Sequence, residues 1–172
     1  RKLRDGEVDF AISRQTGSGD EFESALLLRE RYFLVCNPDH VLCAKEGIYL
    51  AELQGHDLIY TVPGSSLREH LFPRLTEIGV RDTGHQVTSM LTAGGLIAEN
   101  LGVSIVSAQM LTSFIQSGLK AIPILDEDFG SSLHVLRRRG HALSFAANSF
   151  YEMILASDEV KNSVLHFQTI RK

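Results

Sequence analysis

Apolar residues recur along the chain in short runs, and stretches with the spacing of an amphipathic helix separate most of these runs. Short apolar runs bounded by turn residues are typical of buried strands. This pattern predicts strands at Val8–Ser13, Leu58–Val62, Val103–Ser107, Leu119–Leu125 and Leu133–Gly140. A longer run, Ser24–Pro38, contains polar residues at Arg29–Arg31, and we expect it to form two strands that meet there. A one-turn helix is expected around Ala51–Leu53.

The first well-marked helix is predicted within residues 63–80. Ser66 and Glu69 have the spacing of a capping box, in which a hydroxyl and a carboxylate satisfy backbone amides of the first turn. Apolar residues follow on one face, and Gly79 suits the C-terminal cap. Pro73 lies inside this helix, so a kink and a helix that restarts at Pro73 both remain open.

A second helix is predicted within Val87–Ala108, where apolar residues recur at every third or fourth position. Its expected apolar face comprises Val87, Met90, Leu91, Gly94, Ile97, Ala98 and Leu101. Thr88 or Ser89 can cap its start, and Gly102 stands where a left-handed C-cap belongs. Gly94 lies on the apolar face, where a missing side chain would let the helix approach the sheet closely.

Two further helices are predicted, over Ser107–Gly118 and after Ser144. Strands that alternate with helices of this length indicate an α/β protein, and they favour a largely parallel sheet. A chain of 172 residues is long enough for one domain or two small lobes with a buried core.

Composition narrows the class of protein. Lys and Arg number 17 against 21 Asp and Glu, and the resulting net charge of −4 argues against nucleic-acid binding through a basic face of this chain. No apolar run approaches the ~20 residues of a membrane span, so no membrane partner is expected. The chain begins without Met and lacks the apolar stretch of a signal peptide, so we expect a piece of a longer, cytoplasmic protein. Its cysteines, Cys36 and Cys43, are interpreted as reduced thiols.

No residues have the spacing of a catalytic, metal or cofactor site. His40 beside Asp39 lacks a positioned partner for acid–base chemistry, and a solvated turn is the simpler interpretation. Ser65 and Ser66 follow a glycine but lack the G-x-S-x-G pattern of a nucleophile elbow. The basic run Arg137–Arg139 is interpreted as a solvated rim. We therefore predict no enzyme activity, no metal and no cofactor.

Hydroxyl residues stand at three predicted helix starts, Ser65 with Ser66, Thr88 with Ser89, and Ser107. Helix N-termini favour anions because their first amides are unpaired and the helix dipole is positive there. In parallel α/β sheets such starts gather at one edge. A collar of this kind suits a small carboxylate or phosphate, although each hydroxyl can equally be a plain helix cap.

Four segments, in order, resemble the effector-binding domain of LysR-type bacterial transcriptional regulators. They are LRDGEVDFAI, LLLRERYFLVCNPDHVLCAKEGIYLAEL, LTAGGLIAENLGVSIVSA and LHVLRRRGHALSFAANSF. The resemblance implies an α/β fold of two Rossmann-like lobes with mixed sheets, like type 2 periplasmic binding proteins. The first lobe would comprise residues 1–59 and 133–172, without the family's first strand and helix, and the second lobe residues 60–132.

The resemblance also implies a small-molecule effector, with an organic anion expected, in the cleft between the lobes. By position, Ser13, Ser65, Ser66, Thr88 and Ser89 would line this cleft. Such regulators act as homodimers or homotetramers and contact DNA through an N-terminal domain that this chain does not include. The alternative is a solute-binding protein or an enzyme on the same bilobal fold, because fold alone does not determine function.

Overall fold

The computed structural model describes residues 1–14, 20–127 and 129–157. The chain divides into two compact units, unit 1 (Arg1–Glu30 with Ser131–Lys172) and unit 2 (Arg31–Gly130). Each unit is described by itself below. This division assigns residues 31–59 to unit 2, whereas the predicted lobes place them with the first lobe; the assignment of lobes stays a prediction.

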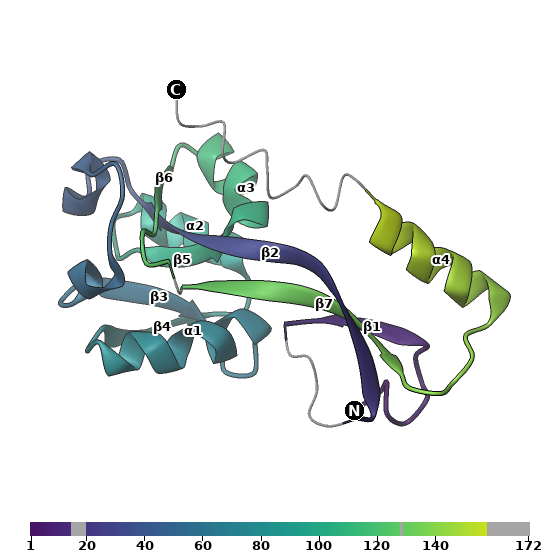
Figure 1. Cartoon of the computed structure of the whole chain (residues 1–172). Coiled ribbons are helices and arrows are strands. Elements are labelled where there is room, and N and C mark those ends of the chain that lie inside the picture. The colour runs from purple at the N-terminus through teal and green to yellow at the C-terminus, as the bar shows by residue number, and fades with distance from the viewer. Residues whose placement is uncertain (15–19, 128, 158–172) are drawn as a thin grey trace. The chain divides into compact units, whose positions relative to one another are not determined.

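Unit 1 is built on a small antiparallel sheet in which β7 (Gly130–Arg138) lies between β1 (Phe10–Ser13) and the first part of β2 (Phe22–Cys36) (Figure 1). β1 and β7 pair antiparallel with Ala11 opposite Leu136. The predicted helix after Ser144 is confirmed as α4 (Phe145–Ala156), and the Ser144 hydroxyl accepts a hydrogen bond from Ala147 N at 3.2 Å. Tyr151 of α4 is buried against the ring of Phe10, at 5.9 Å between ring centroids.

Unit 2 contains a mixed sheet. β3 (Asp57–Thr61) and β4 (Arg81–Val87) pair in parallel, and a parallel bridge from Leu58 to Val103 joins them to β5 (Ser104–Ser107). The later part of β2 pairs antiparallel with β5 and with β6 (Lys120–Pro123). The expectation of a largely parallel sheet is therefore wrong, because a strand running against β5 and β6 occupies the middle.

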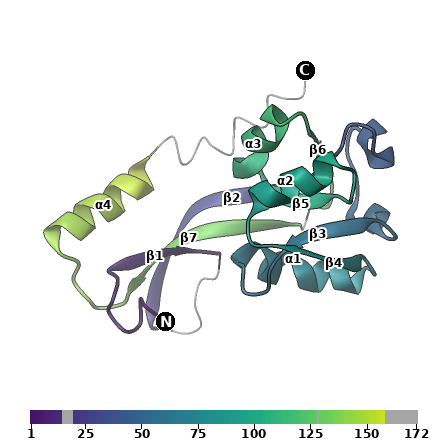
Figure 2. The same ribbon diagram turned by 180° about the vertical axis from the view of Figure 1, so that it is seen from behind.

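The helical segments of unit 2 cover both faces of this sheet. They are the 3₁₀ turns η1 (Val41–Ala44), η2 (Leu50–Leu53) and η3 (Ala108–Met110), and the helices α1 (Ser66–Glu77), α2 (Met90–Ala98) and α3 (Leu111–Gln116). Successive β3 residues Leu58, Ile59 and Tyr60 are all buried. Leu58 and Tyr60 join the cluster that contains Leu71 and Leu75 of α1. Figure 2 shows α2 and α3, which contact one another; α2 lies against β3 and β4, and α3 lies against β6. No helix in the described ranges is both long and apolar enough to span a membrane.

The segment predicted to form two strands is one strand, β2, of 15 residues. The polar residues at its centre do not interrupt it because Glu30 has partners in unit 1. The Glu30 carboxylate accepts hydrogen bonds from Arg14 Nε at 2.6 Å and Nη2 at 2.9 Å. It also accepts one from Ser131 Oγ at 2.6 Å. Ser131 is 101 residues from Glu30 along the chain, so a local sequence pattern does not predict this hydrogen bond.

The predicted capping box of α1 is wrong by one residue. Ser65, not Ser66, is the N-cap, and its hydroxyl accepts a hydrogen bond from Arg68 N at 3.2 Å. Glu69 instead accepts a hydrogen bond from Gly64 N at 3.0 Å. The helix continues through Pro73 to Glu77, so it does not restart at the proline.

The predicted apolar face of α2 is only partly confirmed. Met90, Ala93 and Ile97 form its buried stripe, whereas Leu91 is 69% and Leu101 47% exposed. The helix ends earlier than its apolar pattern, and the left-handed residue after it is Asn100 (φ 55°) rather than Gly102. Leu101 therefore lies beyond the helix.

The glycines of this segment have different surroundings from those expected. A Cβ on Gly94 would lie 3.4 Å from Phe114 of α3, so Gly94 allows close contact with a helix and not with the sheet. A Cβ on Gly95 would meet nothing within 4 Å. The close approach to the sheet belongs to Gly102, where a Cβ would lie 2.7 Å from the carbonyl oxygen of Asp57.

Both cysteines are buried in the unit 2 core. Burial and, to a smaller extent, the neighbouring Cys43 together raise the pKa of the Cys36 thiol to about 12. Because the thiolate is the reactive form, the raised pKa makes Cys36 a poor nucleophile at neutral pH.

Protonation of His40 is expected to destabilise unit 2. Its Nδ1 accepts a hydrogen bond from Leu42 N at 3.3 Å at the start of η1, and its ring lies 5.3 Å from that of His56. Burial and the neighbouring His56 lower the pKa of His40. A lowered pKa means that the unfolded chain binds the proton more readily, so stability should fall as the pH drops below about 6.5.

The variant His40→Asn tests this expectation, because asparagine can accept the same hydrogen bond but does not titrate in this range. Thermal melts at pH 7.5 and pH 5.5 should show a smaller loss of melting temperature for His40→Asn than for the unchanged protein. Equal losses would show that other groups account for the pH dependence.

Candidate functional site

The candidate site lies at one edge of the unit 2 sheet, where β3 and β4 end. Thr61 and Val87 are register partners at the carboxyl ends of these parallel strands, and Val62 N donates to Val87 O at 2.9 Å. α1 begins five residues after Thr61, and α2 begins three residues after Val87. The starts of both helices therefore lie at the same edge, as the sequence predicts.

Ser65 is the best-defined hydroxyl of this edge. Besides accepting from Arg68 N, it is hydrogen-bonded to the hydroxyl of Thr61. The serine thus links the end of β3 to the first turn of α1. Ser66 is the first residue of α1. Ser65 therefore acts as the helix cap of α1. If Ser65 also binds a ligand, it must do so with the same hydroxyl.

Thr88 and Ser89 are exposed residues between β4 and α2. Ser89 is the N-cap, and its hydroxyl accepts a hydrogen bond from Leu91 N at 3.3 Å. Thr88 directly precedes the N-cap Ser89 and is exposed. It lies at the same edge of the sheet as Ser65. Thr88 and Ser89 therefore present polar groups to solvent.

The third predicted start differs from the first two. Ser107 is the last residue of β5, is buried, and makes no side-chain capping bond to η3. Ser13 ends β1 opposite His134 and belongs to unit 1. The structure therefore brings together Ser65, Ser66, Thr88 and Ser89 in unit 2, and Ser13 is placed only within its own unit.

Arg68 is a candidate that the sequence reading missed. It belongs to α1 and is only 8% exposed. Its guanidinium lies 4.6 Å from the ring centre of Phe72 and 5.4 Å from that of Tyr60, and Nη1 donates to Thr61 O at 3.0 Å. An arginine on a helix usually faces solvent. This one is buried because its guanidinium packs on the rings of Tyr60 and Phe72 and donates a hydrogen bond to Thr61 O, contacts that a local sequence pattern does not reveal.

The gap beside Arg68 is small. A gap lined by Thr61, Arg68, Met90 and Ser104, with apolar residues of β3, β5 and α1, has a free volume of about 10 Å³. That volume holds about one water molecule. A small-molecule ligand does not fit into this gap.

The described residues contain no group of three or more His, Cys, Asp or Glu side chains placed to hold a metal ion. The site residues are hydroxyls, helix-start amides and one guanidinium. Groups of these kinds favour anions, through hydrogen bonds and the positive potential of a helix start. They do not by themselves form the nucleophile–base pair that covalent catalysis requires.

Comparison with known families gives a match over nearly the whole chain. The family model described as the LysR substrate binding domain matches residues 1–159. Among curated proteins, the uncharacterized HTH-type transcriptional regulator YbhD of Escherichia coli is 25% identical over 150 residues, which are 87% of this chain and 47% of YbhD. The uncharacterized HTH-type regulator YnfL of the same organism is 26% identical over 86% of this chain and 50% of its own. The chain thus spans about half the length of these relatives.

Solved structures agree with this match. Full-length BenM is 26% identical, with a TM-score of 0.72 over 89% of this chain and 52% of the BenM chain. The effector-binding domain of QuiR in complex with shikimate is 21% identical, with a TM-score of 0.76 over 90% of this chain and 73% of its own. The regulatory domain of Synechocystis CcmR in complex with 2-PG is 20% identical, with a TM-score of 0.75 over 90% of this chain and 76% of its own. The chain therefore has the mixed α/β fold of these domains.

Proposed function

Because this chain belongs to the LysR substrate-binding domain family, a non-enzymatic family of regulator domains, we propose that it senses a small anionic metabolite and thereby controls transcription. The observation that carries the proposal is the pair of helix starts at one sheet edge, with Ser65, Ser66, Thr88 and Ser89 beside the buried Arg68. Hydroxyls, free amides and a guanidinium together favour a carboxylate or phosphate.

The proposed binding place is a cleft between two lobes, 1–59 with 133–172 and 60–132. In this arrangement Ser13 contributes from the first lobe and the helix starts contribute from the second. The similar domains of QuiR and CcmR, which bind shikimate and 2-PG, support a small metabolite as the ligand. The regulator would act in the cytoplasm as a homodimer or homotetramer, with DNA contacted by a domain outside this chain.

Sensing in this scheme depends on a difference in affinity. An effector changes the arrangement of a protein only by as much as it binds one state more tightly than another. A ligand held by residues of both lobes would favour the state in which those residues are close. That state would then change how the DNA-binding domains are presented.

A thermal-shift screen of small organic anions, shikimate included, tests the proposal. A ligand at about 100 times its Kd stabilises the folded state by about 2.7 kcal/mol, which is readily seen as a rise in melting temperature. We expect Ser66→Ala and Thr88→Ala to weaken binding of the anion found by about fivefold each, as for loss of one hydrogen bond. Ser117→Ala, at the end of α3, is the matched control and should leave affinity unchanged.

Two results would contradict the proposal in different ways. If the anion binds but neither Ser66→Ala nor Thr88→Ala changes its Kd, the site is elsewhere. If the intact regulator shows no change in DNA binding on addition of an anion that binds this domain, the domain does not sense that anion.

A further inference from the structure

A charged hollow in unit 1 has no part in the proposed effector site. It has a volume of about 280 Å³ and is lined by Arg4, Asp20, Glu21, Arg138, Arg139 and His141. The volume lies just below the range of about 300–1,000 Å³ for drug-sized ligands, so the hollow suits a smaller molecule. Every lining residue is ionisable, which distinguishes this hollow from an ordinary gap between apolar side chains. The basic run Arg137–Arg139, interpreted from sequence as a solvated rim, supplies two of its walls.

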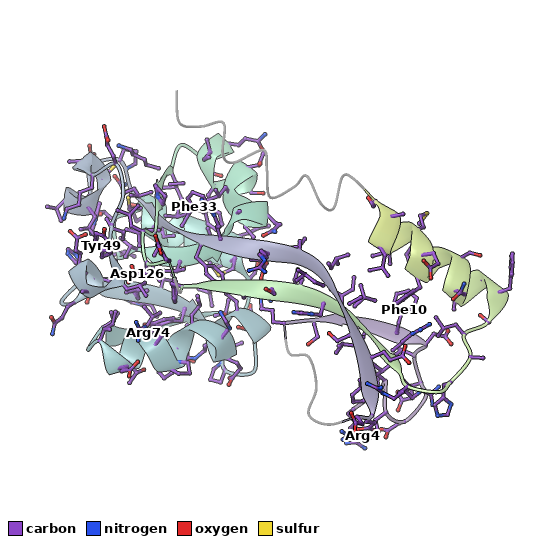
Figure 3. The ribbon with its side chains drawn as sticks, in the orientation of Figure 1. Arg4, Phe10, Phe33, Tyr49, Arg74 and Asp126 are labelled. Carbon is purple, nitrogen blue, oxygen red and sulfur yellow. The ribbon has the colours of Figure 1, made fainter. Side chains whose placement is uncertain are left out.

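The positions of the basic groups around the hollow are fixed by the fold. Arg4, beside the start of β2 (Figure 3), donates two-pronged hydrogen bonds of 2.8–3.0 Å to the Glu21 carboxylate. Those hydrogen bonds lower the pKa of Glu21. Arg139 is held next to the same residue because its backbone N donates to Glu21 O at 2.9 Å.

Arg138 lies against the backbone of Gly6. A Cβ on Gly6 would be 2.9 Å from Nη1 of Arg138, so the glycine leaves room for the guanidinium. Gly6 also has a left-handed φ of 74°, a conformation that other residues rarely adopt. A side chain at position 6 would therefore displace one wall of the hollow.

The charges around the hollow do not cancel. Arg4 and Glu21 neutralise each other, and neither the Arg138 nor the Arg139 guanidinium has a hydrogen bond or ion pair with a described residue. Asp20 supplies one negative charge. Two guanidiniums without a partner among the described residues, against one carboxylate, leave a net positive hollow. Guanidinium groups bind carboxylate and phosphate oxygens through paired hydrogen bonds.

We propose that this hollow is a second binding site, for a small anion of phosphate or carboxylate type with at least two negative charges. Arg138 and Arg139 hold its oxygens, and the Arg4–Glu21 ion pair lines the hollow without adding net charge. Asp20 opposes the ligand and limits its affinity. The site shares no residue with the candidate effector site in unit 2.

Isothermal titration of the full chain with pyrophosphate, and separately with citrate, tests this site and distinguishes phosphate from carboxylate chemistry. Saturable binding of either probe is expected. Arg139→Ala and Arg138→Ala should each weaken it about tenfold, as for loss of a charge-assisted hydrogen bond. Asp20→Asn should strengthen it several-fold by removing a like charge. Arg74→Ala, which removes an exposed arginine of α1, should have no effect.

Arg139→Ala should weaken anion binding and Asp20→Asn should strengthen it, whereas Arg74→Ala should leave it unchanged. This combination distinguishes binding in the hollow from a general attraction of anions to positive charge on the surface. Circular dichroism shows whether each variant is folded, and Arg139 and Asp20 are exposed residues whose replacement should leave the fold intact. The proposal is overturned if neither probe saturates, if Arg74→Ala weakens binding as much as Arg139→Ala, or if Asp20→Asn has no effect. Binding of a DNA duplex in place of both small anions would also overturn it.

Discussion

Glu30→Ala is expected to lower the melting temperature of the domain by about 6–12 °C, since about 3 kcal/mol is lost and each kcal/mol corresponds to about 2–4 °C at this chain length. The Glu30 side chain is 2% exposed and is the shared acceptor of Arg14 and Ser131. Removing it leaves a guanidinium that is 19% exposed without its carboxylate. Most of the lost stability comes from the Arg14 guanidinium, which stays largely buried after its carboxylate partner is removed.

Glu23→Ala is the matched control for Glu30→Ala. Glu23 lies on the same strand and also pairs with an arginine, Arg137, but its side chain is 37% exposed. Exposed pairs contribute about 0–1 kcal/mol, so this variant should melt within a few degrees of the unchanged protein. Equal melting temperatures for the Glu30 and Glu23 variants would show that the buried cluster does not stabilise β2.

Gly102→Ala is expected to destabilise the domain by about 2–4 kcal/mol, from backbone strain and from overpacking. Its φ is 153°, and an added Cβ would lie 2.7 Å from Asp57 O. That oxygen already accepts a hydrogen bond from Val103 N at 2.9 Å. The methyl group would therefore push β3 away from β5 at the bridge that joins them. Urea denaturation measures the loss as a lower midpoint.

Gly95→Ala provides the contrasting measurement. Gly95 lies on the exposed side of α2, where an added Cβ meets no atom within 4 Å. Alanine favours a helix interior over glycine by up to about 1 kcal/mol, so this variant should unfold at a higher urea concentration. If both glycine variants shift the midpoint in the same direction, the assignment of Gly102 to a close contact with β3 is wrong.

Local signals in the sequence predicted those features that depend on a few neighbouring residues. The capping serine before α4 and the glycine that ends α1 are examples, since each satisfies backbone groups within one turn. The order of the helices and of most strands followed from the same kind of pattern, but β4 (Arg81–Val87) was not predicted, because its mostly polar sequence lacks the apolar run of a buried strand. The family resemblance, based on four segments in order, agrees with the family match over residues 1–159.

Features that depend on distant partners could not be predicted in this way. The continuity of β2 depends on Arg14 and Ser131, which satisfy Glu30 from other parts of unit 1. The burial of Arg68 depends on the rings of Tyr60 and Phe72. Of the site residues, the gathering of the two helix starts was predictable from parallel strands, but the guanidinium beside them was not. Whether the five hydroxyl residues bind a ligand stays a prediction.

β4 has a further consequence for self-association of the domain. Among the described strands it pairs only with β3, so it forms an edge of the sheet. Edge strands can recruit another chain and start aggregation. The sequence of β4, RDTGHQV, is mostly polar or charged, and Gly84 has a left-handed φ of 73° that interrupts a flat, extended backbone. The strand that leads into α2 is thus also one that resists edge-to-edge assembly into larger aggregates.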